Sequence, residues 1–378
     1  MNILMLTAYP PVLQMHGGGV RMFHNIRILA EKHSVRVISF VENDVEREML
    51  RSVEEICELV IPVRRVPDFR PHWLSVLPFL VREFSTPEMY RMVDSEFRRK
   101  KVDVLQCEYL QMGQFHRRPA LTVLSILETL SDNAFEAFQN ATDPVERLRL
   151  FYRWMSVLRY ETLMTRKFDR VVTMTETDAT YLRSYSPEAN IRAIPIGINP
   201  SEYAPSPEEP GRRPEVLFLG NFRHLPNVKA AEFLIERIAP LFPDLQFTIS
   251  GSFAPDHVRS DGNVSFPGYV PDTRVLYHTP NTIVAAPLFS GRGQRVKLLE
   301  AFSMACPVIT SSLGASGFPI MDGREALIAD TADAFAAALR RLLSSEELRR
   351  DLGNNARKMI MRDFTWERIG EDLLKCVR

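Results

Sequence analysis

The chain has few cysteines, no excess charge of either sign and no long apolar run. Its four cysteines, Cys57, Cys107, Cys306 and Cys376, share no metal-like spacing. Scattered cysteines in apolar segments are typical of free thiols in a reducing compartment, so we expect a cytoplasmic protein without a disulfide framework. The 47 basic and 47 acidic residues balance, which excludes a general field that would attract nucleic acid. No apolar run reaches the length of a transmembrane helix.

Metal-binding patterns are also missing from the sequence. It contains no Asp-x-Asp motif and no His or Cys cluster at the spacing of metal sites. We therefore expect no metal and no other cofactor. Any negative charge on a ligand then has to be met by side chains and backbone amides.

Short apolar runs separated by amphipathic segments recur along the whole chain. Such alternation predicts βα units, and strands that are apolar on both faces predict parallel sheets covered by helices. The first series of predicted strands is 3–6, 35–41, 102–107, 122–127 and 171–174, and the second is 216–219, 247–250, 264–266, 283–286 and 308–310. The predicted fold class is α/β, with two doubly wound domains.

One segment interrupts this alternation. Residues 199–214 are rich in Pro, Ser and charge, which is typical of a linker. We predict an N-terminal domain over 1–198, the linker over 199–214 and a C-terminal domain over 215–378, whose last helix is a candidate to pack back on the N-terminal domain. Open α/β sheets bind ligands beyond the carboxyl ends of their strands, so two facing domains predict a ligand cleft between them.

The most informative segment is 287–310, whose pattern predicts a strand end, a glycine loop, an amphipathic helix and a second strand. Gly291 and Gly293 leave backbone N–H groups uncovered at a helix N-terminus, where the helix dipole favours an anion. Arg295 and Lys297 add positive charge, and Glu300 follows about one helical turn after Lys297. Amides and lysine for phosphates, with a carboxylate for ribose hydroxyls, suit a nucleoside diphosphate. The alternative is a tight strand-to-helix turn with no ligand.

A second glycine loop follows the first predicted strand. Gly17, Gly18 and Gly19 open a helix, with His16 and Arg21 beside them. We expect this loop to lie at a strand end and to meet the diphosphate as well. The alternative is a flexible turn.

Several motifs, in the same order, resemble glycosyltransferase family 4, whose members have the GT-B fold of two facing Rossmann-like domains. Segments 16–21, 194–199, 216–227, 264–272 and 314–317 are each similar to a family segment. Segment 291–300 resembles a subset of the family with the pattern Gly-x-Gly-x-basic-x-Lys-x-x-Glu. The order and spacing of these pieces carry the resemblance.

The resemblance implies roles for residues of the C-terminal glycine loop and helix. Glu300 corresponds to the family glutamate that holds the ribose of the donor. Lys297 corresponds to a cation near the diphosphate, and Arg295 is a candidate to share that role.

The loop after the strand at 216–219 is a further part of the implied donor site. Many relatives place a basic residue on the donor phosphates from here. Asn221 and Arg223 are the nearest candidates, and Lys229 is the next. The alternative is that Asn227 caps the following helix and Arg223 is solvated.

Two positions depart from the family pattern. Many relatives have a first glutamate eight residues before the second, whereas this chain has Arg292, which leaves recognition of the sugar open. Relatives often have a histidine near the anomeric carbon after the strand at 122–127, and none follows here. Glu128 and then Asp132 are the candidate catalytic substitutes. The alternative for both is a turn carboxylate.

The resemblance implies a hexosyltransferase-like enzyme that moves a sugar from a nucleotide-diphosphate sugar to an acceptor hydroxyl, with retention, in glycan or polysaccharide biosynthesis. The acceptor would be a glycan, a lipid-linked sugar or a small molecule. Two alternatives stay open. One is a catalytically silent sugar-nucleotide-binding subunit, which Arg292 and the missing histidine favour. The other is a sugar-nucleotide epimerase of the same fold, which the scarcity of histidine disfavours.

Residues 145–161 predict a helix that mixes arginines with Phe151, Tyr152 and Trp154. Such a helix could rest on an anionic membrane surface, where lipid-linked acceptors are found, so a peripheral location at the inner face of the membrane is an alternative to a purely cytoplasmic one. The other interpretation is a domain helix that buries one stripe and exposes its arginines.

Overall fold

The chain forms two compact units. The computed structural model describes residues 1–13, 17–66, 77–205, 209 and 211–378. Unit 1 comprises Met1–Pro195 and Ile369–Arg378, and unit 2 comprises Ile196–Arg368. The unit boundary falls just before the predicted domain end at 198, and Ile198 forms a β-bridge with Thr365 inside unit 2. His16 and part of the predicted linker, 206–208 and 210, lie outside the described residues.

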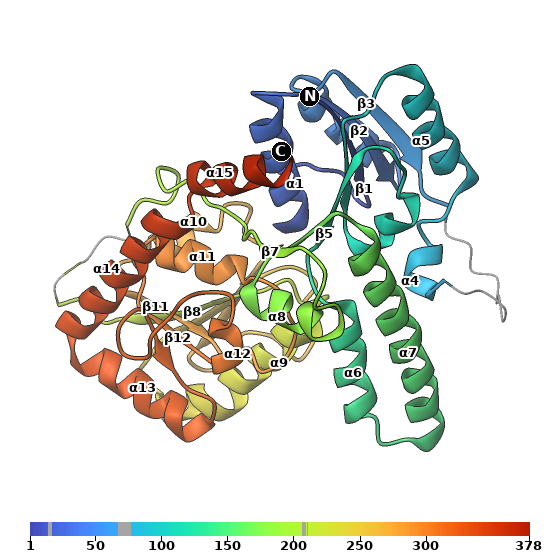
Figure 1. Cartoon of the computed structure of the whole chain (residues 1–378). Helices are drawn as coiled ribbons and strands as arrows, with labels where there is room; N and C mark the ends of the chain where they lie inside the picture. The colour runs from blue at the N-terminus through green and yellow to red at the C-terminus, as the bar shows by residue number, and fades with distance from the viewer. Residues whose placement is uncertain (14–16, 67–76, 206–208, 210) are drawn as a thin grey trace. The chain divides into compact units, whose positions relative to one another are not determined.

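Unit 1 is built on one seven-stranded sheet in which all neighbouring strands pair in parallel, in the order β3-β2-β1-β4-β5-β6-β7 (Figure 1). Its strands are β1 Asn2–Thr7, β2 Ser34–Val41, β3 Leu59–Arg64, β4 Val104–Glu108, β5 Leu121–Ile126, β6 Arg170–Thr173 and β7 Ile191–Ala193. Its helices are α1 Gly17–Ala30, α2 Asp44–Met49, α3 Arg51–Glu54, α4 Phe79–Arg82, α5 Pro87–Arg99, α6 Leu130–Asn140, α7 Pro144–Lys167 and α8 Glu176–Tyr185, with a 3₁₀ segment at Leu110–Phe115.

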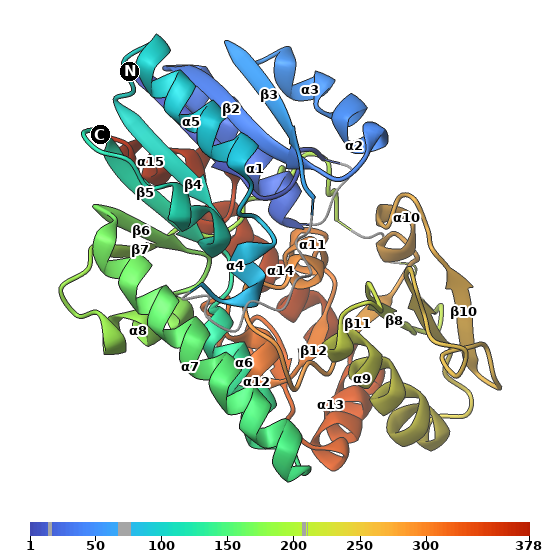
Figure 2. The same ribbon diagram turned by 90° about the vertical axis from the view of Figure 1, so that its right-hand side faces the viewer.

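Burial explains which strands of unit 1 the sequence predicts. In the central strand β1 every residue from Ile3 to Thr7 is buried, because helices cover both faces of the sheet. Figures 1 and 2 show α1 and α5 on opposite faces. The edge strand β3 is only half-buried over most of its length and contains Pro62, a residue that edge strands tolerate. Its apolar run was therefore too weak to be predicted.

Unit 2 is built on a six-stranded parallel sheet in the order β10-β9-β8-β11-β12-β13. Its strands are β8 Glu215–Leu219, β9 Phe247–Ser250, β10 Val264–Gly268, β11 Thr282–Ala286, β12 Val308–Thr310 and β13 Leu327–Ile328. Its helices are α9 Leu225–Phe233, which continues as a π turn at Leu234–Ile238 and a 3₁₀ turn at Ala239–Leu241, α10 Arg274–Tyr277, α11 Val296–Ser303, α12 Ser312–Ala315, α13 Ala332–Ser344 and α14 Glu346–Asp363. The predicted α/β class with two parallel sheets is confirmed.

The end of the chain packs on unit 1. Helix α15 spans Trp366–Cys376, and its residues from Ile369 onward belong to that unit. A Cβ added at Gly370 would lie 3.2 Å from the side chain of Ile28 in α1. The Arg170 guanidinium at the start of β6 donates to the Cys376 carbonyl at 2.5 Å. These contacts tie the last turns of the chain to the first sheet.

Candidate functional site

The strand order of unit 2 places two loops at one position on its sheet. From β8 the chain runs outward through β9 and β10, then returns to β11 on the other side of β8. The loops that leave the carboxyl ends of β8 and β11 therefore diverge from neighbouring strands. Such a reversal is where open α/β sheets bind ligands. The predicted donor residues lie in these two loops and in the helices that follow them.

Two glycines shape the loop after β11. Gly291 and Gly293 have φ of 85° and 81°, a region that residues with a Cβ rarely adopt. A Cβ at Gly291 would also lie 3.1 Å from the ring of Pro226, in the first turn of α9. Glycine is thus required both by the backbone conformation and by the close approach of the β8–α9 segment.

Lys297 joins the two loops. Its ammonium donates to Asn227 Oδ1 at 2.7 Å and lies 4.3 Å from the centre of the Phe218 ring. Asn227 in turn donates through Nδ2 to the carbonyl of Asn221 at 2.7 Å. Burial, and secondarily the charge of Arg295, lowers the pKa of Lys297 to about 7. Within the described part of the chain the ammonium forms no ion pair. Its direct contacts are neutral groups, and the nearby charge of Glu300 opposes the fall in its pKa without cancelling it.

Glu300 lies one turn further along α11 and is held by two tyrosines. Tyr203 Oη donates to Glu300 Oε1 at 3.3 Å, and Tyr277 Oη lies 3.2 Å from Oε2. The Tyr277 hydroxyl is also 3.0 Å from the Lys297 carbonyl, so its one proton is shared between two acceptors. Burial raises the pKa of Glu300 to about 7, against the opposing effect of the two hydroxyls. Burial thus moves the pKa of this carboxyl group and the pKa of the Lys297 ammonium toward neutral pH in one small region.

Arg295 braces the glycine loop. It is the residue before α11 begins, and its guanidinium donates to the carbonyls of Gly291 at 2.7 Å, Arg292 at 2.9 Å and Ser290 at 3.3 Å. The positive charge of Arg295 therefore lies at the loop, but its N–H groups already donate to backbone carbonyls. The sequence did not reveal this bracing role.

Gln294 is a buried residue of the same loop that was not predicted from the sequence. Its Oε1 accepts from the Ile196 N–H at 2.6 Å, and its Nε2 donates to the Ile196 carbonyl at 3.4 Å. The side chain thereby fixes the backbone at the start of unit 2. Nothing in the local pattern indicated it, because its partner lies far away in the sequence.

The structure of the β8–α9 loop contradicts the alternative proposed above for Asn227. Helix α9 begins at Leu225 with His224 before it, so the alternative in which Asn227 caps the helix is wrong. Asn221 Oδ1 accepts from the Arg223 N–H at 3.0 Å, which closes a turn. The exposed Arg223 guanidinium stacks 3.7 Å from the centre of the Phe253 ring. Lys229 is exposed on α9.

In unit 1 the first glycine loop also lies at a reversal of strand order, between β1 and β4. A Cβ at Gly18 would lie 1.9 Å from the Tyr109 hydroxyl, so a larger residue would require the Tyr109 side chain to move. Gly17 and Gly19 belong to the same first turn of α1. Arg21 is buried, pairs with Glu108 at 3.3 Å and donates to the Ile194 carbonyl at 3.1 Å. That arginine therefore has an internal partner.

The two candidate catalytic carboxylates follow β5. Glu128 is exposed and accepts from Asn133 Nδ2 at 3.1 Å, while Asp132 lies in the first turn of α6 and is half-buried. A third carboxylate, Glu161 of α7, was not predicted from the sequence. It is buried and accepts from the Leu130 N–H at 3.0 Å at the start of α6, and burial raises its pKa to about 7. Its contacts make it a cap for that helix.

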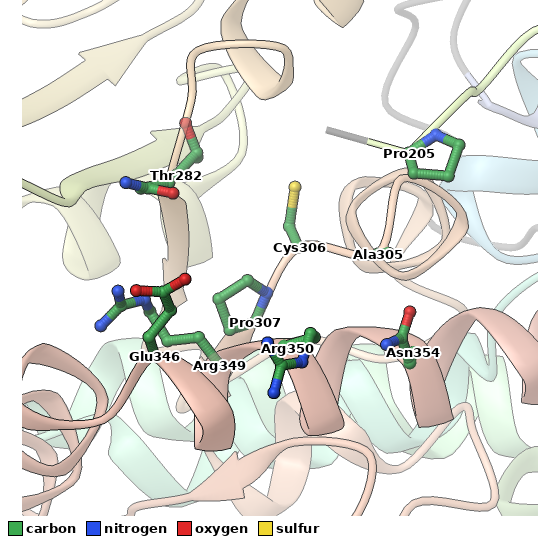
Figure 3. A pocket seen from close by; sticks show the side chains of 10 residues that line it. Pro205, Thr282, Ala305, Cys306, Pro307, Glu346, Arg349, Arg350 and Asn354 are labelled. Carbon is green, nitrogen blue, oxygen red and sulfur yellow. The ribbon is translucent and has the colours of Figure 1, made fainter. Parts of the chain in front are cut away.

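A separate pocket of about 170 Å³ lies at the opposite end of the same strands of unit 2 (Figure 3). Thr282 opens β11 and Pro307 precedes β12, and Arg350 of α14 lines the other side. The predicted donor residues, in contrast, follow the carboxyl ends of the strands. This pocket is therefore distinct from the candidate site.

The described residues contain neither a metal cluster nor a helix that could span a membrane. Across the residues that the structure describes, no group of three His, Cys, Asp or Glu side chains could hold a metal ion. Over the same ranges, no helix combines the length and apolar character needed to cross a bilayer.

Two protein families match the chain. Residues 16–197 match the "Glycosyl transferase 4-like domain", and residues 213–345 match "Glycosyl transferases group 1". Together these matches take in most of both units. The chain is a family-4-like glycosyltransferase.

Relatives of this glycosyltransferase include two proteins of known sequence. It is 20% identical to an "Uncharacterized 44.6 kDa protein in cps region" of Klebsiella pneumoniae, over 99% of each chain. It is 27% identical to the phosphatidyl-myo-inositol mannosyltransferase of Mycolicibacterium smegmatis, over 48% of this chain and 50% of that one.

Solved structures share the fold of this glycosyltransferase. Sucrose-phosphate synthase from Thermosynechococcus elongatus matches with a TM-score of 0.73 at 20% identity, over 99% of this chain and 98% of that one. The Anabaena protein HepE, solved with UDP, matches with a TM-score of 0.72 at 14% identity, over 99% of each chain. At these identities the likeness bears on the fold, and the predicted GT-B class is confirmed.

Proposed function

We propose that this glycosyltransferase takes its sugar from a nucleoside-diphosphate sugar that unit 2 binds at the carboxyl ends of β8 and β11. One observation carries the proposal: next to a glycine loop, the Lys297 ammonium contacts Asn227 Oδ1 and the Phe218 ring, and burial lowers its pKa despite the nearby charge of Glu300. A diphosphate would supply the further negative charge that stabilises the protonated amine. The HepE structures with UDP and with UDP-glucose support the same donor class.

Each neighbouring group then has a defined task. Glu300, oriented by Tyr203 and Tyr277, accepts hydrogen bonds from the ribose hydroxyls. The amides of the loop around Gly291 and Gly293 meet the phosphates. Arg295 contributes charge while it braces the loop. Asn221 and Arg223 border the phosphates from the β8–α9 side.

Departure of the nucleotide is the step that this site would assist. When the bond from the sugar's anomeric carbon to the diphosphate breaks, its electron pair goes to the phosphate oxygen. Lys297 and preorganised amides neutralise that developing charge. We therefore propose that the reaction needs no metal or other cofactor, because the protein supplies the positive charge.

For the acceptor side we propose that Glu128, with Asp132 as the second choice, orients the acceptor hydroxyl or takes its proton as it attacks the anomeric carbon. The family resemblance favours retention of configuration and a hexose as the sugar. The relative from the cps region supports polysaccharide biosynthesis as the pathway class.

A thermal-shift screen of nucleoside diphosphates and nucleotide sugars tests the donor class. A ligand at 100 times its dissociation constant adds about 2.7 kcal/mol of stability. Calorimetry on Glu300→Gln then tests the site: a charge-assisted hydrogen bond is worth about 1.5–3 kcal/mol, so binding should weaken by about 10- to 150-fold. If both Glu300→Gln and Lys297→Met bind the nucleotide like the wild type, the assignment is wrong. Slow hydrolysis of the donor without acceptor separates an enzyme from a silent binding subunit.

A further inference from the structure

Helix α7 has two apolar stripes, and only one is used inside the protein. On the inner side, Val157 is buried, and the Trp154 ring lies 4.6 Å from the ring of Phe135 in α6. Figures 1 and 2 show α6 and α7 as an antiparallel hairpin. The packing of α7 against α6 in this hairpin therefore uses only the inner side of α7.

The second stripe faces solvent. Apolar and aromatic residues recur along it at spacings of three, four and eight, which places them on one side of a helix. Their side chains are between 42% and 77% exposed. They are Val145, Leu148, Tyr152, Met155 and Leu163. We call these five residues the outer face of α7.

Positive charge accompanies the outer face. Arg149 and Arg159 follow Val145 and Tyr152 by one and two turns, so they border the same side. Glu146 pairs with Arg149 at 3.5 Å, but both side chains are largely solvated, so this pair is weak. The whole chain is neutral, so this basic, apolar surface is a local concentration.

A second copy of the chain is a poor match for this surface. A symmetric contact would place the arginines of one copy against those of the other, which is repulsive. An anionic bilayer offers apolar depth for the leucine, methionine and valine, an interface suited to tyrosine, and negative charge for the arginines. We propose that the outer face of α7 binds the surface of an anionic lipid bilayer.

Vesicle binding tests this proposal without a sugar donor, so its result is independent of the proposed function. The full chain is floated with vesicles of phosphatidylcholine alone or with one-third phosphatidylglycerol. We expect at least tenfold stronger binding to the anionic vesicles and a loss of that preference in high salt. Leu148→Ser combined with Tyr152→Ser and Met155→Ser should lower binding at least tenfold, because apolar surface no longer enters the interface.

Arg149→Gln with Arg159→Gln should lower binding by about 25-fold, since one basic residue near an anionic surface contributes about fivefold. Val45→Ser, at an exposed apolar position on α2, is the matched control and should bind like the wild type. Equal binding by the wild type and both multiple variants overturns the proposal, as does no binding to anionic vesicles. A wild-type dimer in light scattering that the triple variant dissociates would assign the face to a second copy instead. The arginine variant keeps the test valid if the triple variant misfolds.

Discussion

Replacement of Lys297 by methionine tests the donor site through both binding and pH. Methionine keeps the length of the side chain and removes its charge. The lost charge-assisted contact with phosphate is worth about 1.5–3 kcal/mol, so affinity for a nucleoside diphosphate should fall by about 10- to 150-fold at pH 7. Lys358→Met, at an exposed lysine of α14, is the control and should bind normally.

The lowered pKa of Lys297 adds a second signature. In the free protein the amine is half-protonated near pH 7, and it must be charged to hold phosphate. Wild-type affinity should therefore fall as the pH rises from 7 to 9, by up to about tenfold per pH unit, whereas Lys297→Met should lose this part of the slope. Isothermal titration calorimetry at pH 7, 8 and 9 measures both effects.

The titration of Lys297 should also affect how the stability of the free protein depends on pH. The folded-state pKa of Lys297 is below its ordinary value of 10.5, so between about pH 7 and 10.5 the unfolded chain binds more protons. The wild type should thus gain stability relative to Lys297→Met as the pH rises through this window, by at most about 2 kcal/mol between pH 7.5 and 9.0. Denaturant unfolding of both proteins gives the difference. An unchanged affinity in the methionine variant, or parallel pH profiles, would refute the reasoning.

Three further outcomes are expected. Glu128→Gln should lower turnover by about 10²–10⁴-fold and leave nucleotide binding normal, because a positioned base is lost. Asp132→Asn is the comparison variant. If steady-state kinetics show that only Asp132→Asn lowers turnover, the role belongs to Asp132. Activity should persist in excess chelator, and a loss that magnesium or manganese restores would show that a metal stabilises the leaving group. Gly18→Ala should destabilise the fold by about 1–3 kcal/mol, because the new methyl group would overlap the Tyr109 hydroxyl; a wild-type melting temperature would contradict this.

The sequence by itself determined the class of fold and singled out the segment that we propose as the centre of the donor site. Central parallel strands such as β1 and β11 are covered on both faces, so their apolar runs are continuous and visible without a structure. The segment from Gly291 to Glu300 is also local. One loop and one helical turn fix the order of glycine, cation and carboxylate, because these spacings depend only on backbone geometry.

Only the tertiary structure decided what surrounds these groups. Asn227 reaches Lys297, 70 residues away, because β8 and β11 are neighbours in the sheet. Tyr203 contacts Glu300 over a separation of 97 residues. The burial that brings both pKa values near 7 follows from that packing and has no local signature. The edge strands β3 and β13 and the exposed stripe of α7 depend likewise on which faces the rest of the protein covers. Contacts between residues far apart in the sequence depend on the topology of the fold. The pattern of residue types in a single sequence does not reveal these contacts.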